Sequence, residues 1–338
     1  MMIDALVQLG LFSVKMLIVA VFILAVLAGI LAILSKGKEK GKGKLVIKHL
    51  NQKYDETTED ILSHTLPKKL YKQFIKDKKQ QEKAKKKSEE RTKQIYVINF
   101  HGDMKASAVS QLREEVTAVL HVAKPNDEVI LKLDSAGGVV HGYGLAAAQL
   151  LRLRAHRIPL TICIDKIAAS GGYMMACVAN KILAAPFAII GSIGVIVQLP
   201  NFNRVLKDKH IEFEQLTAGE YKRTLTVFGE NTEEGREKLQ HEIEDIHQLF
   251  KNLIKENRQQ LDINKVATGE HWLALQAIDL QLVDEIKTSD EYLLERSKAA
   301  ELYELSYETK KSLLSKLSAS ANLMFDTLKG CSQYLAKH

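Results

Sequence analysis

Apolar residues gather in two long runs that lack charged side chains. The first run, residues 16–34, contains 19 residues without a charge. A helix of that length extends about 28 Å, close to the thickness of a bilayer core. A cleaved signal peptide usually has a basic start and a shorter apolar core, whereas this chain carries Asp4 and no base before Lys15. We therefore expect an uncleaved N-terminal membrane anchor.

The second apolar run, residues 182–200, contains residues that helices avoid. Pro186, Gly191 and Gly194 interrupt it, and such residues break a continuous helix. We predict buried strands and turns in this run rather than a second membrane span.

From residue 94 onward, short apolar strands alternate with amphipathic helices. Each strand is a run of β-branched and aromatic residues, and each helix has apolar residues three or four positions apart. The predicted strands are 95–100, 128–134 and 160–165, and the predicted helices are 107–122 (with Ser107 as a cap), 142–156 and 170–179. This alternation predicts βαβ units, a mostly parallel sheet and an α/β fold.

The segments around this core are largely helical in pattern. An apolar stripe predicts a long helix over 231–260, and a short strand is expected at 211–216 before it. The expected organisation is an anchor (1–35), a Lys-rich linker with helical segments such as 70–93 (36–93), a globular domain (94–290) and a helical C-terminal extension (291–338).

The composition is that of a globular protein, but the charge is concentrated in one segment. The 338 residues are 46% hydrophobic and carry a net charge of +7. Residues 36–93 contain 18 Lys and one Arg against nine acids, a net of +10, which leaves −3 for the rest. We therefore predict no nucleic-acid partner for the globular domain. Five lysines between 36 and 44 follow the first apolar run, and such flanks favour the cytoplasmic side of a membrane.

Two glycine-containing turns between strands and helices are candidates for chemistry. Residues 134–138 read Asp-Ser-Ala-Gly-Gly, and such glycines can turn backbone N–H groups into a cleft, where they stabilise an oxyanion. Residues 168–173 read Ala-Ala-Ser-Gly-Gly-Tyr, which leaves the Ser170 hydroxyl uncrowded at a helix start, as a nucleophile requires. Taken singly, each turn is also compatible with a plain connection or a helix-capping serine. Tyr173 and the residues after Gly138 are candidates for lining a specificity pocket.

A nucleophilic serine needs a base, and no histidine has a suitable context. His241 and His247 are six positions apart, so they share no helix face for a metal, and three cysteines do not suffice for a four-cysteine zinc site. A lysine can act as a base where burial lowers its pKa. Lys222, in Gly-Glu-Tyr-Lys, is a candidate among many lysines, and Ser192, in Gly-Ser-Ile-Gly-Val, could orient it.

In this order, the motifs resemble those of the signal peptide peptidase A family of membrane serine peptidases. The matching segments are Asp-Ser-x-Gly-Gly at 134–138, Ala-Ser-Gly-Gly-Tyr at 169–173, Gly-Ser-Ile-Gly-Val at 191–195, Gly-x-Tyr-Lys at 219–222 and the stretch 272–284. Each motif is weak alone, and five in order are specific. With its anchor and basic linker, the chain most resembles the single-unit inner-membrane peptidases of Gram-negative bacteria.

The resemblance implies a crotonase-like (ClpP-like) α/β fold and a Ser–Lys dyad that requires no cofactor and no metal. By position, Ser170 is the expected nucleophile and Lys222 the expected general base. The supporting groups are the oxyanion donors Gly138, Gly171 and, less directly, Gly137, together with the lysine-orienting Ser192. Two positions depart from the family pattern, namely Ala136, where proline is common, and Gln281, where glycine is common.

The resemblance also implies partners and a location. Family members form homo-oligomers, and in single-unit members the lysine can come from the neighbouring copy. The expected partners are peptide or unfolded protein substrates, including remnant signal peptides, a lipid bilayer and further copies of this chain. The expected location is the bacterial inner membrane, with the cytoplasmic side favoured by the lysine flank and the periplasmic side by the usual assignment of relatives.

Three other functions compete with this one. Residues 142–147 mimic the Gly-x-Gly-x-x-Ala fingerprint of dinucleotide-binding enzymes, but the preceding strand ends at Asp134, eight residues before Gly142, whereas the fingerprint requires its first glycine directly after the strand. A catalytically idle membrane scaffold of the same fold is disfavoured because both Ser170 and Lys222 are present. A coenzyme A-dependent crotonase enzyme would leave the anchor and the Ser-Gly-Gly motif without a role.

Overall fold

The computed structural model of the chain describes residues 11–24, 26, 27, 29, 43–87 and 91–308. They belong to two compact units, one of residues 45–307 and one of residues 1–44 and 308–338. In the second unit, residues 11–24 are helical with exposed apolar side chains. No helix within the described residues is long and apolar enough to cross a membrane. Part of the predicted anchor over 16–34 lies outside the described residues.

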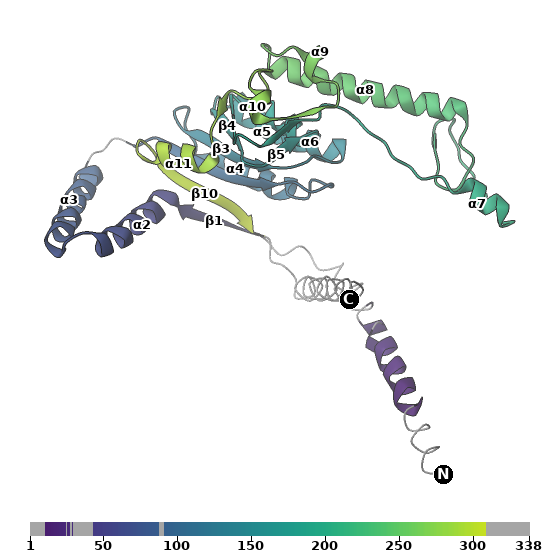
Figure 1. Ribbon diagram of the computed structural model, residues 1–338, viewed down its shortest axis with the longest axis horizontal. Coiled ribbons are helices and arrows are strands. Elements are labelled where there is room, and N and C mark those ends of the chain that lie inside the picture. The colour runs from purple at the N-terminus through teal and green to yellow at the C-terminus, as the bar shows by residue number, and fades with distance from the viewer. Residues whose placement is uncertain (1–10, 25, 28, 30–42, 88–90, 309–338) are drawn as a thin grey trace, which may run out of the picture. The chain divides into compact units, whose positions relative to one another are not determined.

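In the described part of the chain, seven strands form the main sheet, in the order β1-β10-β2-β3-β4-β6-β9 (Figure 1). Each neighbouring pair from β10 to β9 is parallel. These strands are β1 (Lys44–His49), β10 (Glu301–Glu308), β2 (Gln94–His101), β3 (Glu128–Asp134), β4 (Leu160–Ile164), β6 (Lys181–Ala184) and β9 (Glu285–Ile286). The predicted α/β fold with βαβ units is confirmed, and its crotonase-like assignment stays a prediction.

A smaller sheet carries the residues of interest for chemistry. It contains β5 (Ile167–Ala169), β7 (Ile189–Gly191) and β8 (His271–Leu273), with β5 parallel and β8 antiparallel to β7. An isolated bridge pairs Ser135, just after β3, with Ala168 in β5. This bridge places the two predicted turns, 134–138 and 168–173, side by side.

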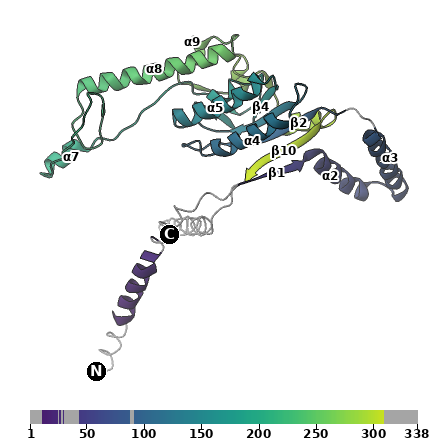
Figure 2. The same cartoon turned by 180° about the vertical axis from the view of Figure 1, so that it is seen from behind.

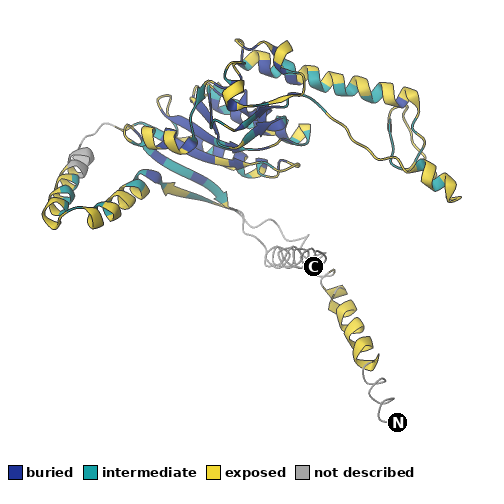
Figure 3. Ribbon diagram, viewed as in Figure 1, coloured by how far each residue is buried: buried dark blue, intermediate teal, exposed yellow. Residues whose placement is uncertain are grey.

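Helices cover both faces of the main sheet. Alternate residues of a strand point to opposite faces, so Ile98 and Phe100 of β2 join a large hydrophobic cluster with α4, α5 and α6, whereas Ile95 and Val97 join a smaller cluster with α11. Figure 3 shows the buried residues concentrated around this sheet. The helices are α2 (Leu50–Thr65), α3 (Lys68–Lys87), α4 (Val109–Val122), α5 (Val140–Ala155), α6 (Gly171–Ala176), α7 (Asn203–Asp208), α8 (Glu233–Asn257), α9 (Ile263–Val266), α10 (Ala274–Ala277) and α11 (Ser289–Ser297).

Residues 195–232, called the arm below, extend away from the main sheet. The arm contains α7 and lies at the N-terminal end of α8, as both views show (Figures 1 and 2). The strand predicted over 211–216 is wrong, because these residues have no regular structure and pair with no strand. By contrast, α8 contacts the body near its other end, through Phe250 and Ile254.

Both ends of the compact unit differ from the predicted helical pattern. Residues 301–308 form β10 inside the sheet instead of a helical extension, and residues 44–49 of the predicted linker form β1 beside it. These strands pair across the whole length of the unit, so local periodicity does not predict them. At α4 the cap is Ala108 rather than Ser107.

Two further predictions concern apolar segments. The run 182–200 forms β6, β7 and turns that are mostly buried up to Ile193, as predicted, whereas residues 196–200 are exposed and do not match the prediction of a buried run. Residues 142–147 lie inside α5 rather than in a loop directly after a strand. A helix interior cannot wrap a pyrophosphate with its N–H groups, which removes the dinucleotide-binding alternative.

Candidate active site

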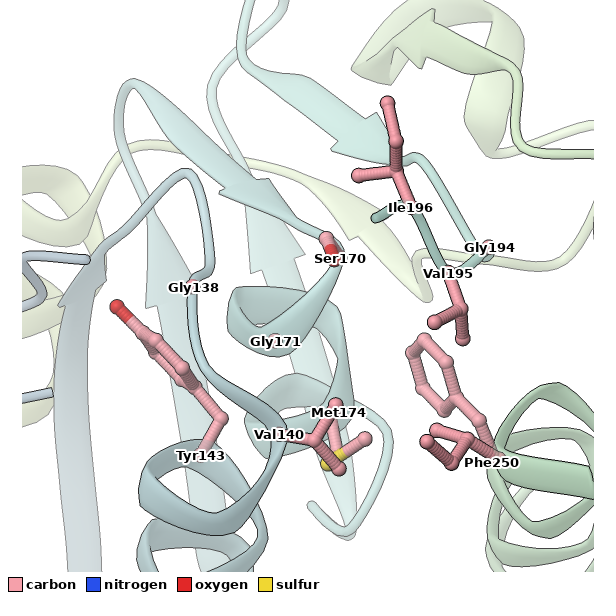
Figure 4. Close-up of a pocket in the computed structure, with 11 residues that line it drawn as sticks. Gly138, Val140, Tyr143, Ser170, Gly171, Met174, Gly194, Val195, Ile196 and Phe250 are labelled. Carbon is pink, nitrogen blue, oxygen red and sulfur yellow. The ribbon is translucent and has the colours of Figure 1, made fainter. Parts of the chain in front are cut away.

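Ser170 occupies the sharp turn between β5 and α6. Its backbone has φ 51° and ψ −118°, a conformation that residues with a Cβ rarely adopt and that occurs mainly at functional turns. The Ser170 N–H donates to the carbonyl oxygen of Gly191 at 2.8 Å, and the side chain makes no capping hydrogen bond. The hydroxyl therefore faces the adjoining pocket instead of capping the helix (Figure 4).

The two glycines after Ser170 are required by close packing. A Cβ on Gly171 would lie 2.4 Å from Cγ of Tyr143, and a Cβ on Gly172 would lie 2.3 Å from the carbonyl oxygen of Ser135. Any larger residue would push α6 away from α5 and from the end of β3. The Ser-Gly-Gly sequence thus allows the serine turn to sit directly against the neighbouring turn.

The neighbouring turn contains Gly137 and Gly138. Gly137 has φ 90°, and a Cβ there would lie 2.6 Å from the backbone nitrogen of Gly171. The Gly137 N–H donates to Oγ of Ser135 at 3.1 Å. The N–H groups of Gly138 and Gly171 donate to no acceptor within the described residues. Of the three glycines predicted as oxyanion donors, two therefore have an available N–H beside Ser170.

Tyr143 supports this turn, and the sequence analysis did not assign it to the site. Its ring is fully buried in α5, and its hydroxyl donates to the carbonyl oxygen of Asp103 at 2.8 Å. Burial raises the pKa of Tyr143, so the phenol stays neutral. The sequence feature that could have indicated this role is a single tyrosine in an alanine-rich helix that begins two residues after Gly138.

A small pocket of about 80 Å³ opens beside Ser170. Its lining contains no charged side chain and combines three turns with three helices, α5, α6 and α8 (Figure 4). The lining residues are Gly138, Val140, Tyr143, Ser170, Gly171, Met174, Gly194, Val195, Ile196, Ile246 and Phe250. The uncharged lining makes the pocket suited to an apolar group.

Tyr173 does not line the pocket, so its predicted role there is wrong. Its ring is fully buried and its hydroxyl donates to the carbonyl oxygen of Leu282 at 3.0 Å. Arg258, just after α8, binds the same turn through the Asp284 carboxylate at 2.8 Å and the Gln281 carbonyl oxygen at 2.9 Å. One turn thus holds both α6 and α8, the helices that form opposite walls of the pocket.

Ser192 lies in the turn after β7 that leads to the Ser170 pocket. It follows β7 with φ 51°, and its N–H donates to the carbonyl oxygen of Glu270 at 2.6 Å. Two residues later, Gly194 lines the Ser170 pocket. The Ser192 hydroxyl makes no hydrogen bond with a described residue, so it is available to a group that enters the site.

Lys222 lies in the arm and does not meet Ser170 within one chain. It lines a separate pocket of about 700 Å³ formed by arm residues. A Cβ on Gly235, in the first turn of α8, would lie 2.4 Å from the carbonyl oxygen of Thr224. From Gly235 to Phe250, α8 extends about 22 Å. Lys222 is therefore held near one end of α8, and the Ser170 pocket lies toward the other.

Other reactive side chains do not converge on a second site within the described residues. No group of three or more His, Cys, Asp or Glu in that part of the chain could hold a metal ion. Cys163 and Cys177 are buried, and burial raises the pKa of each thiol to about 12. His101 and His141, near the turns, are exposed. Neither buried thiol is a thiolate at neutral pH, which leaves the half-buried Ser170 as the nucleophilic side chain that lines the pocket.

Known proteins are similar to this chain over most of its length. The family model for Peptidase family S49 N-terminal matches residues 4–150, and that for Peptidase family S49 matches residues 152–303. "Probable protease SohB" from Haemophilus influenzae is 47% identical over 330 residues, which cover 94% of this chain and 93% of the relative. "Probable protease SohB" from Buchnera aphidicola subsp. Acyrthosiphon pisum is 54% identical over 228 residues, 68% of each chain.

Among solved structures, a mutant of the 1510-N membrane-bound stomatin-specific protease in complex with a substrate peptide has a TM-score of 0.40 and 16% identity, over 61% of this chain and 80% of that chain. The two family models together cover most of the chain, and the relatives confirm the resemblance to single-unit members of the SohB type. The chain belongs to peptidase family S49, a family of serine-type peptidases.

Proposed function

We propose that this chain is a membrane-anchored serine endopeptidase that uses Ser170 as nucleophile and Lys222 as general base. Its substrates are unfolded or membrane-derived peptides, including remnant signal peptides. The observation that carries the proposal is the strained Ser170 turn, whose hydroxyl faces a pocket between two unused backbone donors, Gly138 and Gly171.

The chemistry follows from these groups. Ser170 Oγ attacks the peptide carbonyl while its proton passes to Nζ of Lys222, which acts as the general base. The oxyanion accepts hydrogen bonds from the N–H groups of Gly138 and Gly171. Lys222 then protonates the leaving amine, and it next activates the water that hydrolyses the acyl-enzyme. In the assembled site, the Ser192 hydroxyl orients the lysine.

A neighbouring copy of the chain supplies the lysine. Two observations support this: Lys222 lines a pocket of the arm rather than the Ser170 pocket, and the arm exposes large apolar side chains. Leu216 is 97% exposed and Ile196 76% exposed, and such surfaces typically mark protein interfaces. In a head-to-tail homo-oligomer, the arm of one copy would reach the Ser170 pocket of the next.

Mixing two inactive variants tests both the dyad and its origin. Ser170→Ala and Lys222→Ala, each assembled alone, should have no peptidase activity on unfolded casein while remaining folded. After dissociation and reassembly as an equal mixture, roughly a quarter of the interfaces combine an intact serine with an intact lysine. Activity near that fraction supports the proposal. If the mixture has no peptidase activity while wild-type protein treated in the same way is active, the proposal that two copies form one active site is refuted.

The membrane anchor is a separate part of the proposal. It is supported by the apolar run over 16–34, the exposed apolar side chains of the helix over 11–24 and the lysines that follow. We place the protein in the bacterial inner membrane on this basis. Extraction of the full chain from membranes by detergent but not by alkaline carbonate is the expected result, and release by carbonate would contradict the anchor.

A further inference from the structure

Helix α3 carries an unusual concentration of positive charge. Residues 68–87 include ten lysines and two acids. Six of these lysines have described, exposed side chains, and we call them the lysine stripe: Lys68, Lys69, Lys72, Lys76, Lys79 and Lys83.

The lysine stripe occupies one side of the helix. At 100° per residue, the six positions fall within an arc of about 100°. The half-buried residues Tyr71, Phe74 and Lys78 lie outside this arc. Lys78 pairs with Glu59 at 2.7 Å and with Asp55 at 3.3 Å, both from α2. α3 therefore turns one face toward α2 and presents the stripe on another.

The stripe has no counter-charge within the described residues. None of its six ammonium groups makes an ion pair there, whereas Lys181 and Lys287 of the body are each paired with Glu285. By helical position, Asp77 lies about 80° beyond one edge of the stripe and Glu82 about 40° beyond the other, so neither acid falls within the stripe. Solvated helices usually intersperse both signs of charge, so a face of cations alone indicates a polyanionic partner.

Helices α2 and α3 form a helical hairpin that carries the stripe, and α2 is bound to the peptidase body. Leu50, at the start of α2, is buried in the smaller hydrophobic cluster. The Asn51 side chain donates to the carbonyl oxygens of Ser297 and Ala300 and accepts from the Leu302 N–H. Docking of the stripe would therefore also position the peptidase body, because α2 is bound to that body.

We propose that the lysine stripe docks on the anionic headgroups of a phospholipid bilayer and holds the peptidase body against the membrane surface. A straight row of lysines matches a planar array of phosphates, and polybasic helices bind such surfaces. Single-stranded nucleic acid is a poorer match, because aromatic platforms normally accompany the basic groups, and Tyr71 and Phe74 lie off the stripe. The apolar helix over 11–24 is a second membrane-suited element of the same chain.

Lysine footprinting of the full chain tests this docking. The protein is placed in nanodiscs of phosphatidylcholine alone or rich in phosphatidylglycerol, and amine acylation is measured by mass spectrometry. In the anionic discs the stripe lysines should be acylated at about a third of their rate in phosphatidylcholine discs, or more slowly still. The acylation rates of the exposed Lys209 and Lys255 should change little. At 1 M salt, where screening shortens to about 3 Å, the protection should vanish.

A matched pair of variants separates the stripe from general charge. Lys72, Lys76 and Lys79→Gln should restore the reactivity of Lys68, Lys69 and Lys83 in anionic discs. The control, Lys209, Lys255 and Lys298→Gln, removes the same charge and should leave the protection intact. Equal reactivity of the wild-type stripe in both discs would overturn the proposal, as would protection that appears only when RNA is added. If the anchor fails to insert, phosphatidylglycerol vesicles added to the full chain give the same readout. No step needs peptidase activity, so this test and that of the Ser–Lys site fail independently.

Discussion

The hydroxyl groups of Tyr143 and Ser135 lie 2.6 Å apart, and their partners fix the direction of both protons. Tyr143 donates its one hydroxyl proton to the carbonyl oxygen of Asp103 at 2.8 Å, so Ser135 donates to the Tyr143 oxygen. Ser135 Oγ then accepts the Gly137 N–H at 3.1 Å. Three oriented hydrogen bonds thus join the turn that precedes Gly138 to α5.

Tyr143→Phe should lower kcat more than it changes KM. Without the phenol, the Ser135 hydroxyl loses its acceptor and the Gly137–Gly138 turn loses its fixed direction. The free energy of unfolding should fall by about 1–2 kcal/mol. Urea unfolding and steady-state peptide hydrolysis measure the two effects. Tyr96→Phe is the control, because its hydroxyl donates to Gln94 at 2.7 Å near the start of β2, and an equal loss of kcat there would refute the specific role of Tyr143.

Gly138→Ala should abolish most activity while the fold survives. A Cβ at this position would lie 2.2 Å from the carbonyl oxygen of Met104, so the turn must move and carry its N–H with it. Loss of an oxyanion donor typically lowers kcat about 100-fold or more. Gly144→Ala, where nothing lies within 4 Å of the new Cβ, should retain activity and gain about 0.5–1 kcal/mol of stability inside α5. Circular dichroism and hydrolysis rates distinguish these outcomes.

The pocket beside Ser170 should select a small apolar residue before the scissile bond. Its volume of about 80 Å³ and its uncharged lining favour alanine or valine over phenylalanine at that position. Phe250→Leu should enlarge the pocket and reduce the alanine-to-phenylalanine ratio of kcat/KM by about tenfold. Leu249→Ala, at a side chain that is 68% exposed on the same helix, should leave the ratio unchanged. A ratio that does not respond to Phe250→Leu would place the specificity elsewhere.

Glu128→Gln should destabilise the fold in a pH-dependent manner. Burial disfavours the charged carboxylate, but hydrogen bonds from Arg296, Tyr292 and Lys93 outweigh it and hold the pKa of Glu128 below its ordinary value. A depressed folded pKa contributes stability above the unfolded pKa, and this contribution disappears as the pH falls through the folded value.

We expect the free energy of unfolding to fall by about 3 kcal/mol at pH 7, and the difference from wild type to shrink below about pH 4. Urea unfolding at both pH values provides the measurement. Asp290→Asn, at a side chain that is 90% exposed, should change stability by less than about 0.5 kcal/mol. A pH-independent loss at Glu128 would assign the effect to packing instead of charge.

Local patterns predicted most of the sheet, because each central strand is a continuous apolar run followed by its own helix. β1 and β10 escaped prediction because they pair with each other across the length of the compact unit. Tyr143 escaped because its contact with Ser135 depends on how α5 packs. Gln281, where the family often has glycine, has φ 61°, which explains why glycine is common at that position.

The sequence motifs placed Ser170 and the glycine turns correctly relative to each other, since short loops connect them to adjacent strands. The same motifs could not position Lys222, because the part of the arm that carries it, residues 201–232, contains no strand over 211–216 and does not line the Ser170 pocket. The order of motifs in a sequence indicates which catalytic groups are present. It does not determine where a long segment such as the arm places its lysine.

The position of β10 has a consequence for how the protein is made. His49, at the end of β1, bonds Glu301, a residue 252 positions later. While the ribosome is still synthesising the chain, β1 has no partner strand and the edge of β2 stays open. Synthesis of residues 301–308 therefore completes the main sheet, and a nascent chain stalled before residue 301 lacks the strand that joins β1 to β2.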